Sequence, residues 1–502
     1  MPRDTNVPRM GDDVKDVNTI ANLLLEVGRR RAGPDANYAA QRAAMMGVMA
    51  DAMWVSEETQ LQALVSTTAE VTVGDLRYRR LGQKSSATYH GLWGTHVVEE
   101  PLYRQGDEHN GPTLHPLEVR VGMLANHVLP DAARTFGLLA AYMTSTESEG
   151  VMGEMGFRPP GRAFLERRVK TIAGEMAAMA SQLDEACRKA ENDDQEHPEV
   201  AAVSCGLDRM AVQMDELLPK GEAAKHKTKR RKPYQRAQPP PAVHNWRMAW
   251  VASVTTYARN GDALHTTRYG TDAGGDRDGL VARVKADIDA TVRRYPGIPV
   301  LCIQDGAKDL TSLPTGLRAE LTDEELAALP TQLVNSRITP AQFHHLTDFE
   351  HLMGYLDNVV NTCEPAGDPR NMKLWYRSKL LHEDDAIDRI LVHLRWRARN
   401  QPSSKKAARA ALAKAIKYIR KRRKTMRYAS LHQQNLPIGS GATESTCALM
   451  QLRVKRPGMA WKPAGLRATM TIRGFVLSDR WDAAWAAYAA TKRKDVGHAQ
   501  AA

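Results

Sequence analysis

The chain has 502 residues, with 70 Lys and Arg against 58 Asp and Glu and a formal net charge of +12. Its length allows two or three domains with their own cores, and its positive charge favours a polyanionic partner, most simply nucleic acid, over a generic basic soluble protein. No apolar run approaches the roughly 18 residues of a membrane span, no apolar signal core follows the charged N-terminus, and the five scattered cysteines indicate buried thiols in a reducing cytosol rather than disulfides or a zinc site.

The N-terminal part of the chain is predicted to be mainly helical. Residues 1–70 alternate alanine-rich helical stretches with polar ones, and residues 71–192 form a second region that opens with a small β-hairpin between 71 and 104. Four predicted helices follow: 117–128, 131–144, 147–155 and 161–189. Short helices joined by tight turns, with a basic last helix, are typical of a helix-turn-helix DNA reader. An ordinary helical bundle is the alternative.

A polar linker precedes residues 199–365, where the pattern becomes mixed α/β. Three strands, a helix and a fourth strand are predicted in this order: 200–205, 246–257, 263–269, 279–294 and 298–303. Asn260-Gly261 is a hairpin signal, so the first three strands form an antiparallel meander. The helix before the fourth strand predicts a parallel crossover. This is the order of an RNase H-like fold, in which the first and fourth strands lie side by side.

The rest of the chain is predicted to complete this fold. Residues 343–346 are a candidate fifth strand, and residues 366–436 are helical and strongly basic. We interpret the basic block as a helical insertion domain, and residues 437–490 as the last core helix and C-terminal region. The predicted fold class is an α/β RNase H-like catalytic core with an α-helical insertion domain, preceded by a mainly α-helical N-terminal DNA-binding region with a small β-hairpin.

A glycine-rich turn from Pro437 to Gly441 opens into a helix that carries Glu444 in its first turn. Ser440 or Thr443 is the expected cap of this helix. A lone glutamate at this position most simply complements the helix dipole. The alternative is a metal-binding carboxylate, which needs partner aspartates on strands.

Asp208 and Asp305 are the candidate partners because they follow the first and fourth predicted strands. Mg²⁺ takes oxygen ligands, usually one or two carboxylates plus substrate phosphate, and two such ions clamp the reacting oxygens of a displacement at phosphorus. The sequence therefore predicts a Mg²⁺ or Mn²⁺ site at Asp208, Asp305 and Glu444. Taken singly, each aspartate is more simply explained as a strand-end residue, Asp305 in a turn and Asp208 paired with Arg209.

Further motifs follow in a fixed order along the chain. They are Gly206-Leu207-Asp208-Arg209, Trp246-Arg247-Met248-Ala249-Trp250, Gln304-Asp305-Gly306-Ala307, Asp348-Phe349-Glu350-His351, Pro437 to Glu444 and Arg453 to Trp461. In this order they resemble a bacterial insertion-sequence transposase of the DDE class, in the Kra-type group that is distantly akin to Mutator-like transposases. The resemblance runs from about residue 70 to 485, and the last two motifs are its most specific part.

The resemblance implies a role for five residues. Asp208 and Asp305 match the first two catalytic aspartates, and Glu444 matches the catalytic glutamate. Asp348 and His351 match an accessory pair, in which His351 touches the scissile phosphate or orients a metal ligand. A core or surface helix histidine is the alternative for His351.

Two positions depart from the family pattern. Residues 308–312 lack a tryptophan that is usual there, and Ala448 stands where lysine is common. Neither change removes a carboxylate, but both bear on metal-site support or DNA contact. Asp215 is a fallback for the first aspartate.

Basic segments supply the expected DNA contacts, because Lys and Arg neutralise phosphates. They are Lys417, Arg420, Lys421, Arg422, Arg423, Lys424 and Arg427 in one helical segment, Lys229, Arg230, Arg231 and Lys232 in a loop, and Arg453, Lys455 and Arg456 after the glycine-rich turn. For the first segment, a solvated helix face is the alternative. Trp461 suits stacking on a flipped base, although a buried core tryptophan is the simpler interpretation.

The predicted function is that of a metal-dependent DNA transposase that cuts and joins strands. Its expected partners are double-stranded DNA, as terminal repeats and target, and a further copy of itself as a homodimer or higher oligomer, with no membrane. We expect a bacterial cytoplasmic, nucleoid-associated protein. Two alternatives stay open: a catalytically silent transposase-derived DNA-binding protein, and an RNase H-like nuclease without strand transfer.

Overall fold

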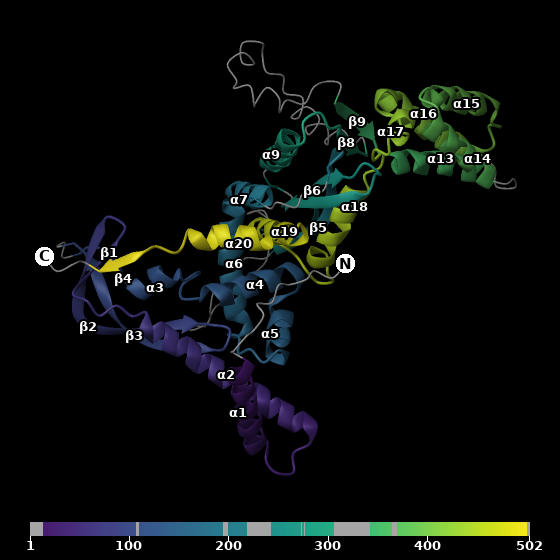
Figure 1. Cartoon of the computed structure of the whole chain (residues 1–502). Coiled ribbons are helices and arrows are strands. Elements are labelled where there is room, and N and C mark those ends of the chain that lie inside the picture. Colours follow the sequence, from purple (N-terminus) through teal and green to yellow (C-terminus); the bar gives the residue numbers. More distant parts are fainter. Residues whose placement is uncertain are drawn as a thin grey trace, which may run out of the picture. The chain divides into compact units, whose positions relative to one another are not determined.

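The computed structural model divides the chain into two compact units (Figure 1). The first unit comprises Met1–Ile172 together with Trp485–Ala502, and the second comprises Ala173–Ala484. The structure describes residues 14–106, 110–193, 199–217, 242–272, 274–275, 277–305, 342–363 and 369–498. No helix in these ranges is both long and apolar enough to cross a membrane. The division of the chain into five predicted regions stays a prediction.

The first unit begins with two helices, α1 (Val14–Ala32) and α2 (Tyr38–Ala63), and continues into a sheet. The sheet has the order β10-β1-β2-β3-β4. Its strands are β1 (Glu70–Val73), β2 (Leu76–His90), β3 (Thr95–Gln105), β4 (Thr113–Leu114) and β10 (Val496–His498). The predicted β-hairpin is confirmed, as β2 paired with β3. The sequence did not predict that β10, from the far end of the chain, pairs with β1.

Short helices follow this sheet, and two of them differ from the prediction. They are α3 (Pro116–Val121), α4 (Pro130–Tyr142), α5 (Ser145–Glu154), α6 (Arg162–Ala178) and α7 (Ala180–Asp193). The helix predicted to reach residue 128 ends at Gly122, whose φ of 76° ends α3 in a left-handed conformation. The single helix predicted for 161–189 is interrupted at Met179. The helix-turn-helix interpretation stays a prediction.

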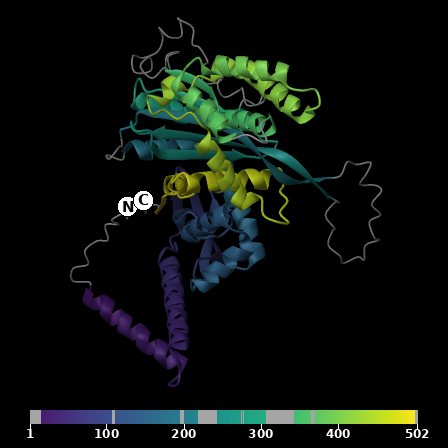
Figure 2. The same cartoon turned by 90° about the vertical axis from the view of Figure 1, so that its right-hand side faces the viewer.

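The second unit is built on a five-stranded mixed sheet of order β7-β6-β5-β8-β9. Its strands are β5 (Ala202–Leu217), β6 (Ala242–Tyr257), β7 (Ala263–Thr271), β8 (Val300–Gln304) and β9 (Phe343–Thr347), with α9 (Arg277–Arg294) between β7 and β8. The antiparallel meander β5-β6-β7 and the parallel pairing of β8 with β5 are both confirmed. Figure 2 shows the long β5–β6 hairpin extending away from the rest of the sheet.

Each face of this sheet is covered by different helices. On one face, Val203, Cys205 and Leu207 of β5 pack with apolar residues of α9. On the other face, Met210 and Val212 pack with α18 (Gly441–Val454) and α19 (Pro463–Leu477). Because strand side chains alternate between faces, β5 contributes one set of residues to each core.

A helical block follows β9 and has a core of its own. Its helices are α13 (Phe349–Cys363), α14 (Pro369–His382), α15 (Ala386–Asn400), α16 (Lys406–Arg422) and α17 (Ala429–His432), with a 3-10 turn at Arg423–Thr425. Leu356, Leu380, Leu394 and Ile419 are nearly inaccessible to solvent in its centre. The predicted helical character of the 366–436 block is therefore confirmed for its described residues, and α13 belongs to the same core.

Candidate active site

Strand register aligns the three predicted aspartates at one edge of the second unit's sheet. Cys205 of β5 and Cys302 of β8 are the last paired residues of these two strands, and extending their register by three positions brings Asp208 level with Asp305. Gln304 of β8 pairs with Thr347 of β9, so Asp348 follows in line with Asp305. Both pairings are parallel. Asp305 and Asp348 therefore directly follow β8 and β9, whereas Asp208 lies within β5, which continues to Leu217 instead of ending before Asp208 as predicted.

Alternation places these aspartates on the sheet face opposite α9. Cys302 packs in the α9 core and Ile303 in the core on the other face, so Asp305 follows Ile303 onto that other face. Leu207 likewise packs toward α9, and Asp208 points the opposite way. This is the face that α18 covers.

Glu444 lies in the first turn of α18, as predicted. Ser440 is at the N-cap position, but its hydroxyl does not cap the helix. It donates instead to Glu444 Oε1 at 3.1 Å. Glu444 is exposed to solvent, and its negative charge at the helix N-terminus is stabilised by the helix dipole.

A close backbone approach fixes α18 against β5 beside Asp208. A Cβ built on Gly206 would lie 2.1 Å from Thr443 Oγ1 and 3.1 Å from the Ile303 carbonyl oxygen. The Thr443 hydroxyl also lies 2.7 Å from that of Ser253 on β6. Glycine at 206 therefore permits the contact that holds the residue next to Glu444 against the strand that carries Asp208.

Cys447 connects α18 to Asp208. Its thiol donates to Asp208 Oδ2 at 3.4 Å, and its side chain lies one helical turn after Glu444. Burial, and then the negative charges of Asp208 and Glu444, raise the pKa of the Cys447 thiol. The thiol therefore stays protonated and acts as a donor to Asp208. The sequence had indicated only a buried cysteine at this position.

Asp348 is 1% exposed and binds two backbone amides. Its Oδ1 accepts from the His351 amide at 2.5 Å, at the start of α13, and its Oδ2 accepts from the Ser440 amide. The Asp348 amide donates to the Gln304 carbonyl at 2.7 Å. Asp348 thus ties together β8, α13 and the glycine-rich turn before Glu444.

His351 is exposed, and it contacts Asp348 through its backbone rather than its ring. The imidazole lies beside two tyrosines, with ring centroids 5.6 Å from Tyr355 and 5.8 Å from Tyr418. An exposed imidazole above this edge is free to meet a ligand, but no contact here assigns it a chemical role. Its predicted catalytic role stays a prediction.

Tyr418 of α16 brings the basic helix to Asp305. Its hydroxyl donates to the Asp305 carbonyl at 2.9 Å. Burial raises the pKa of Tyr418 above its ordinary value; the Arg422 charge opposes this shift, and the nearby Asp305 and Asp348 add to it. The Arg422 guanidinium lies 4.2 Å from the centre of the Tyr418 ring. The end of α16 is therefore held at the edge that carries the aspartates.

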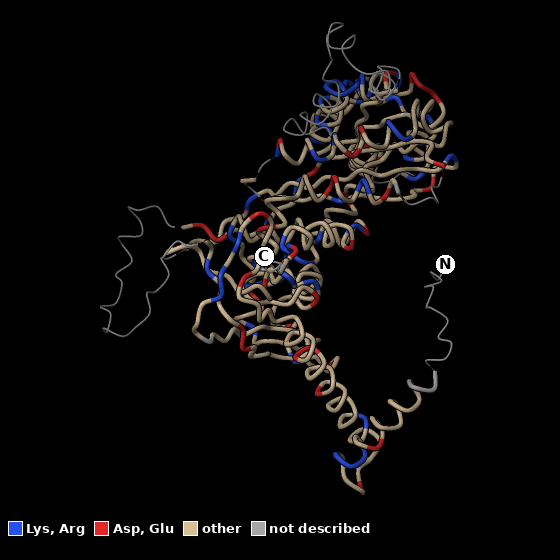
Figure 3. Tube along the Cα trace, turned by 60° about the vertical axis from the view of Figure 1, so that its left-hand side comes forward, with Lys and Arg blue, Asp and Glu red and all other residues tan. Residues whose placement is uncertain are grey.

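Most of the predicted DNA-contacting residues near this edge are exposed. Exposed side chains are those of Lys417, Arg420, Lys421, Arg423, Lys424, Arg427 and Lys455, and half-buried ones are those of Arg422 and Arg456. Arg423 forms an ion pair of 3.0 Å with Asp388. Figure 3 shows basic and acidic positions interspersed along much of the described chain. Lys229, Arg230, Arg231 and Lys232 lie outside the described residues.

Arg453 departs from the predicted DNA contacts because the structure buries it. Its side chain is 7% exposed, and its guanidinium lies 5.4 Å from the centre of the Trp461 ring. The Trp461 indole donates to the Val454 carbonyl at 2.8 Å and packs against the α18–α19 core. Trp461 thus has the packing role that the sequence favoured, and Arg453 supports the same core.

Asp215 does not lie with the other carboxylates. It is seven residues beyond Asp208 on β5, and an odd separation puts it on the opposite face of the strand. It lies 3.5 Å from His244 of β6. The fallback assignment therefore has no support from the geometry.

The carboxylates of Asp208, Asp305 and Glu444 are the right type of ligand for Mg²⁺ or Mn²⁺, but they are not close enough together to hold an ion by themselves. Carboxylate oxygens are the ligands that these hard cations prefer. Among the described residues, however, no three His, Cys, Asp or Glu side chains form a group that could hold an ion. A site at Asp208, Asp305 and Glu444 would therefore draw the remaining ligands from substrate phosphate and water.

Comparison with protein-family models found no match, and comparison with curated proteins found none. Among solved structures, the chain is similar to one described as "Drosophila P element transposase strand transfer complex". The identity is 11%, the match covers 70% of this chain and 91% of that one, and the TM-score is 0.32. A likeness at this level carries no functional argument, so the site itself has to support the functional conclusion.

Proposed function

We propose that this protein is a DNA transposase of an insertion sequence, with an RNase H-like catalytic core formed by the second unit's sheet. Asp208, Asp305 and Glu444 would hold Mg²⁺ or Mn²⁺ and carry DNA strand cleavage and strand transfer. The observation that supports this most is the parallel pairing of β5 with β8, whose register brings Asp208 of β5 level with Asp305 just after β8, on the sheet face covered by the helix that carries Glu444.

Each residue has a distinct task in this proposal. Divalent ions at the carboxylates would neutralise phosphate charge and hold the attacking and leaving oxygens in line. Cys447 keeps Asp208 oriented, because its thiol donates to one carboxylate oxygen and leaves lone pairs of the carboxylate available. Asp348 orders the turn before Glu444 through the Ser440 amide.

The exposed cations of α16 are proposed to bind the DNA backbone next to the acidic edge. Tyr418 holds this helix at Asp305, so phosphates bound by Arg420 or Lys421 would lie near the carboxylates. Such contacts release counterions and make DNA affinity fall with salt. The helical block would then act as an insertion domain that positions DNA.

A catalytically silent DNA-binding protein is the second candidate, and two observations favour it. No metal-sized cluster of three donors occurs in the described part of the chain, and Glu444 faces solvent. If Asp208, Asp305 and Glu444 do not hold a metal ion together on bound DNA, the exposed cations of α16 would bind DNA without cutting it.

The decisive experiment is cleavage of a labelled duplex that carries the DNA flanking this reading frame. Reactions contain Mg²⁺, Mn²⁺ or EDTA, with wild type and Glu444→Gln in parallel. Nicks at the element ends that require the metal and vanish in Glu444→Gln, while DNA binding persists, would support catalysis. Binding without metal-dependent cleavage in either protein would favour the silent candidate, and cleavage without joined products would favour a nuclease.

A further inference from the structure

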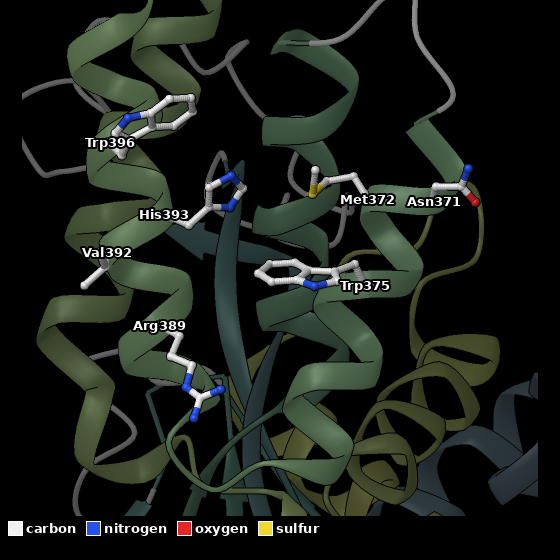
Figure 4. A pocket seen from close by; sticks show the side chains of 7 residues that line it. All are labelled: Asn371, Met372, Trp375, Arg389, Val392, His393 and Trp396. Atoms are coloured by element: carbon white, nitrogen blue, oxygen red, sulfur yellow. The ribbon is translucent and has the colours of Figure 1, made fainter.

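A hollow of about 670 Å³ lies between helices α14 and α15 of the helical block (Figure 4). It is lined by Asn371, Met372 and Trp375 from α14, and by Arg389, Val392, His393 and Trp396 from α15. Figure 4 shows Trp375 and His393 pointing into the space between the two helices. Its volume falls within the range of about 300–1,000 Å³ that is usual for small-ligand pockets.

Met372 packs against the core of the helical block, whereas the other apolar residues of the hollow lie outside that core. On α15, Ile390 and Leu394 are fully buried in that core, whereas Val392 is 64% and Trp396 is 61% exposed. Trp375 on α14 is 38% exposed. Val392 and Trp396 leave most of their apolar surface exposed, and a ligand that covered it would gain about 25 cal/mol per Å² of apolar surface buried.

The rings in the hollow are ordered relative to one another. The His393 ring lies 5.5 Å from Trp375 at an interplanar angle of 77°, and 6.3 Å from Trp396 at 17°. The Tyr376 hydroxyl lies 3.2 Å from His393 Nδ1 and holds the imidazole in place. Two indole rings and an imidazole are therefore already positioned for contact with a flat aromatic ligand. Binding would cost little side-chain entropy.

The polar groups at the rim suit the edge of a nucleobase. Asn371 and Arg389 line the hollow beside the rings, and both carry N–H groups. Arg389 is already held by Asp385 at 2.9 Å and Glu383 at 3.0 Å, and Glu383 also pairs with Lys379, so these four charges balance. The binding energy would therefore come mainly from stacking on the rings, with Arg399 one turn beyond Trp396 available for a phosphate.

We propose that this hollow binds an unstacked base of single-stranded DNA, at a site separate from the acidic edge of the sheet. The proposal rests on the proposed function to the extent that it makes DNA the ligand. Aromatic stacking tolerates any base, so the site would hold a strand without reading its sequence.

The test uses the full chain and a short fluorescein-labelled single-stranded oligonucleotide, with a duplex of the same sequence for comparison. Affinity is measured by fluorescence anisotropy at low and high salt for wild type, Trp396→Ala, Trp396→Phe and Leu374→Ala. Leu374 is the matched control, since it is an apolar residue of α14 that is 56% exposed but does not line the hollow. Thermal melts confirm that each variant is folded.

Trp396→Ala should weaken single-strand binding about 5- to 100-fold and duplex binding much less, because each stacked base contributes that much. Trp396→Phe should retain most of the affinity, and Leu374→Ala all of it. The ratio between wild type and Trp396→Ala should be the same at both salt concentrations, because stacking releases no counterions.

Wild-type affinity in Trp396→Ala would overturn the proposal, as would an equal loss for single strand and duplex. Self-association of wild type that Trp396→Ala abolishes, with oligonucleotide binding unchanged, would make the hollow a protein interface instead. Intact single-strand binding by a wild-type protein that never cleaves DNA would count against the proposed catalysis and leave the base site standing.

Discussion

Both faces of the second unit's sheet carry charged residues, but these residues differ in how deeply they are buried and how fully they are paired. On the α9 face, Arg480 is 5% and Asp287 is 3% exposed, and their side chains meet at 2.7 Å. On the α18 face, Glu444 is exposed and Asp208 is half-buried. Buried charge has to be fully paired to be tolerated, whereas carboxylates at an accessible edge can exchange their partners. The charges on the first face stabilise the fold, whereas Asp208 and Glu444 on the second face remain at least partly accessible to a ligand.

The paired face is a network rather than a single pair. Asp287 also accepts from Arg188 at 2.6 Å and from the Tyr269 hydroxyl, and Arg480 reaches Glu191 of α7 at 2.6 Å. Burial pushes the pKa of Asp287 upward, but the Arg480 charge and the Tyr269 and Arg188 hydrogen bonds outweigh it and keep this pKa below its ordinary value. The network therefore depends on an ionised Asp287.

The largest effect should follow from changing the accessible edge. Asp305→Asn should lower metal-dependent DNA cleavage by about 1,000-fold, because losing a metal carboxylate removes several kcal/mol of charge stabilisation. Its urea midpoint should remain close to that of wild type. A variant that cleaves normally, or one that unfolds, would place Asp305 with the structural charges instead. Cleavage of an end-labelled duplex and urea unfolding measure the two quantities.

The next effect concerns the paired face. Arg480→Ala should lower the free energy of unfolding by about 3–5 kcal/mol, because it leaves Asp287 buried without its main partner. Arg259→Ala is the matched control, since its ion pair with Glu199 is exposed and should contribute about 1 kcal/mol or less. Equal losses in the two variants would contradict the distinction between the faces.

The same network makes the stability of the fold depend on pH at the acid end. The pKa of Asp287 is lower in the folded than in the unfolded protein. Asp287 therefore contributes its full stabilisation above its unfolded-state pKa of about 4. This stabilisation is lost as the pH falls below that value and through the folded pKa. Between about pH 5 and about pH 3, one unit either side of that unfolded pKa, the free energy of unfolding of wild type should therefore fall more than that of Asp287→Asn. Urea midpoints across this range test the difference.

An intermediate loss of stability is expected at the contact between Gly206 of β5 and Thr443 of α18. Gly206→Ala should destabilise the protein by about 1–3 kcal/mol, because its methyl group would overlap the Thr443 hydroxyl. Adding Thr443→Ala should recover part of the loss through a coupling between the two sites. Additive losses in the double variant would show that the contact is not close in solution. Denaturant unfolding of the two singles and the double supplies the cycle.

The smallest effect should come from the thiol that joins Asp208 to α18. Cys447→Ala should lower cleavage by about 10-fold, the lower end for a group that orients a metal ligand. Cys447→Ser, which keeps a donor, should recover most of the activity. If Ser and Ala behave alike, Cys447 acts only as a packing residue. The Mg²⁺ concentration that gives half-maximal rate should rise in the Ala variant alone.

The sequence was sufficient for local structure in the second unit because the signals there are local. Strand alternation, the Asn260-Gly261 turn and the proline-glycine turn before Glu444 each act within a few residues. They predicted the meander, the crossover helix and the start of α18. Helix ends were less predictable: α3 stops early because Gly122 adopts a positive φ, and the break between α6 and α7 has no proline or glycine to announce it.

Only the tertiary structure decided which distant residues meet. The contact of Gly206 with Thr443, the Cys447–Asp208 hydrogen bond and the Tyr418–Asp305 hydrogen bond each join segments more than 100 residues apart. So does the pairing of β10 with β1. Such contacts depend on register, packing and burial summed over the whole fold, and no periodicity in the chain encodes them. The sequence by itself determined which residues can carry the chemistry, and the fold decided which of them lie at one edge, because side-chain proximity is a property of packing rather than of spacing along the chain.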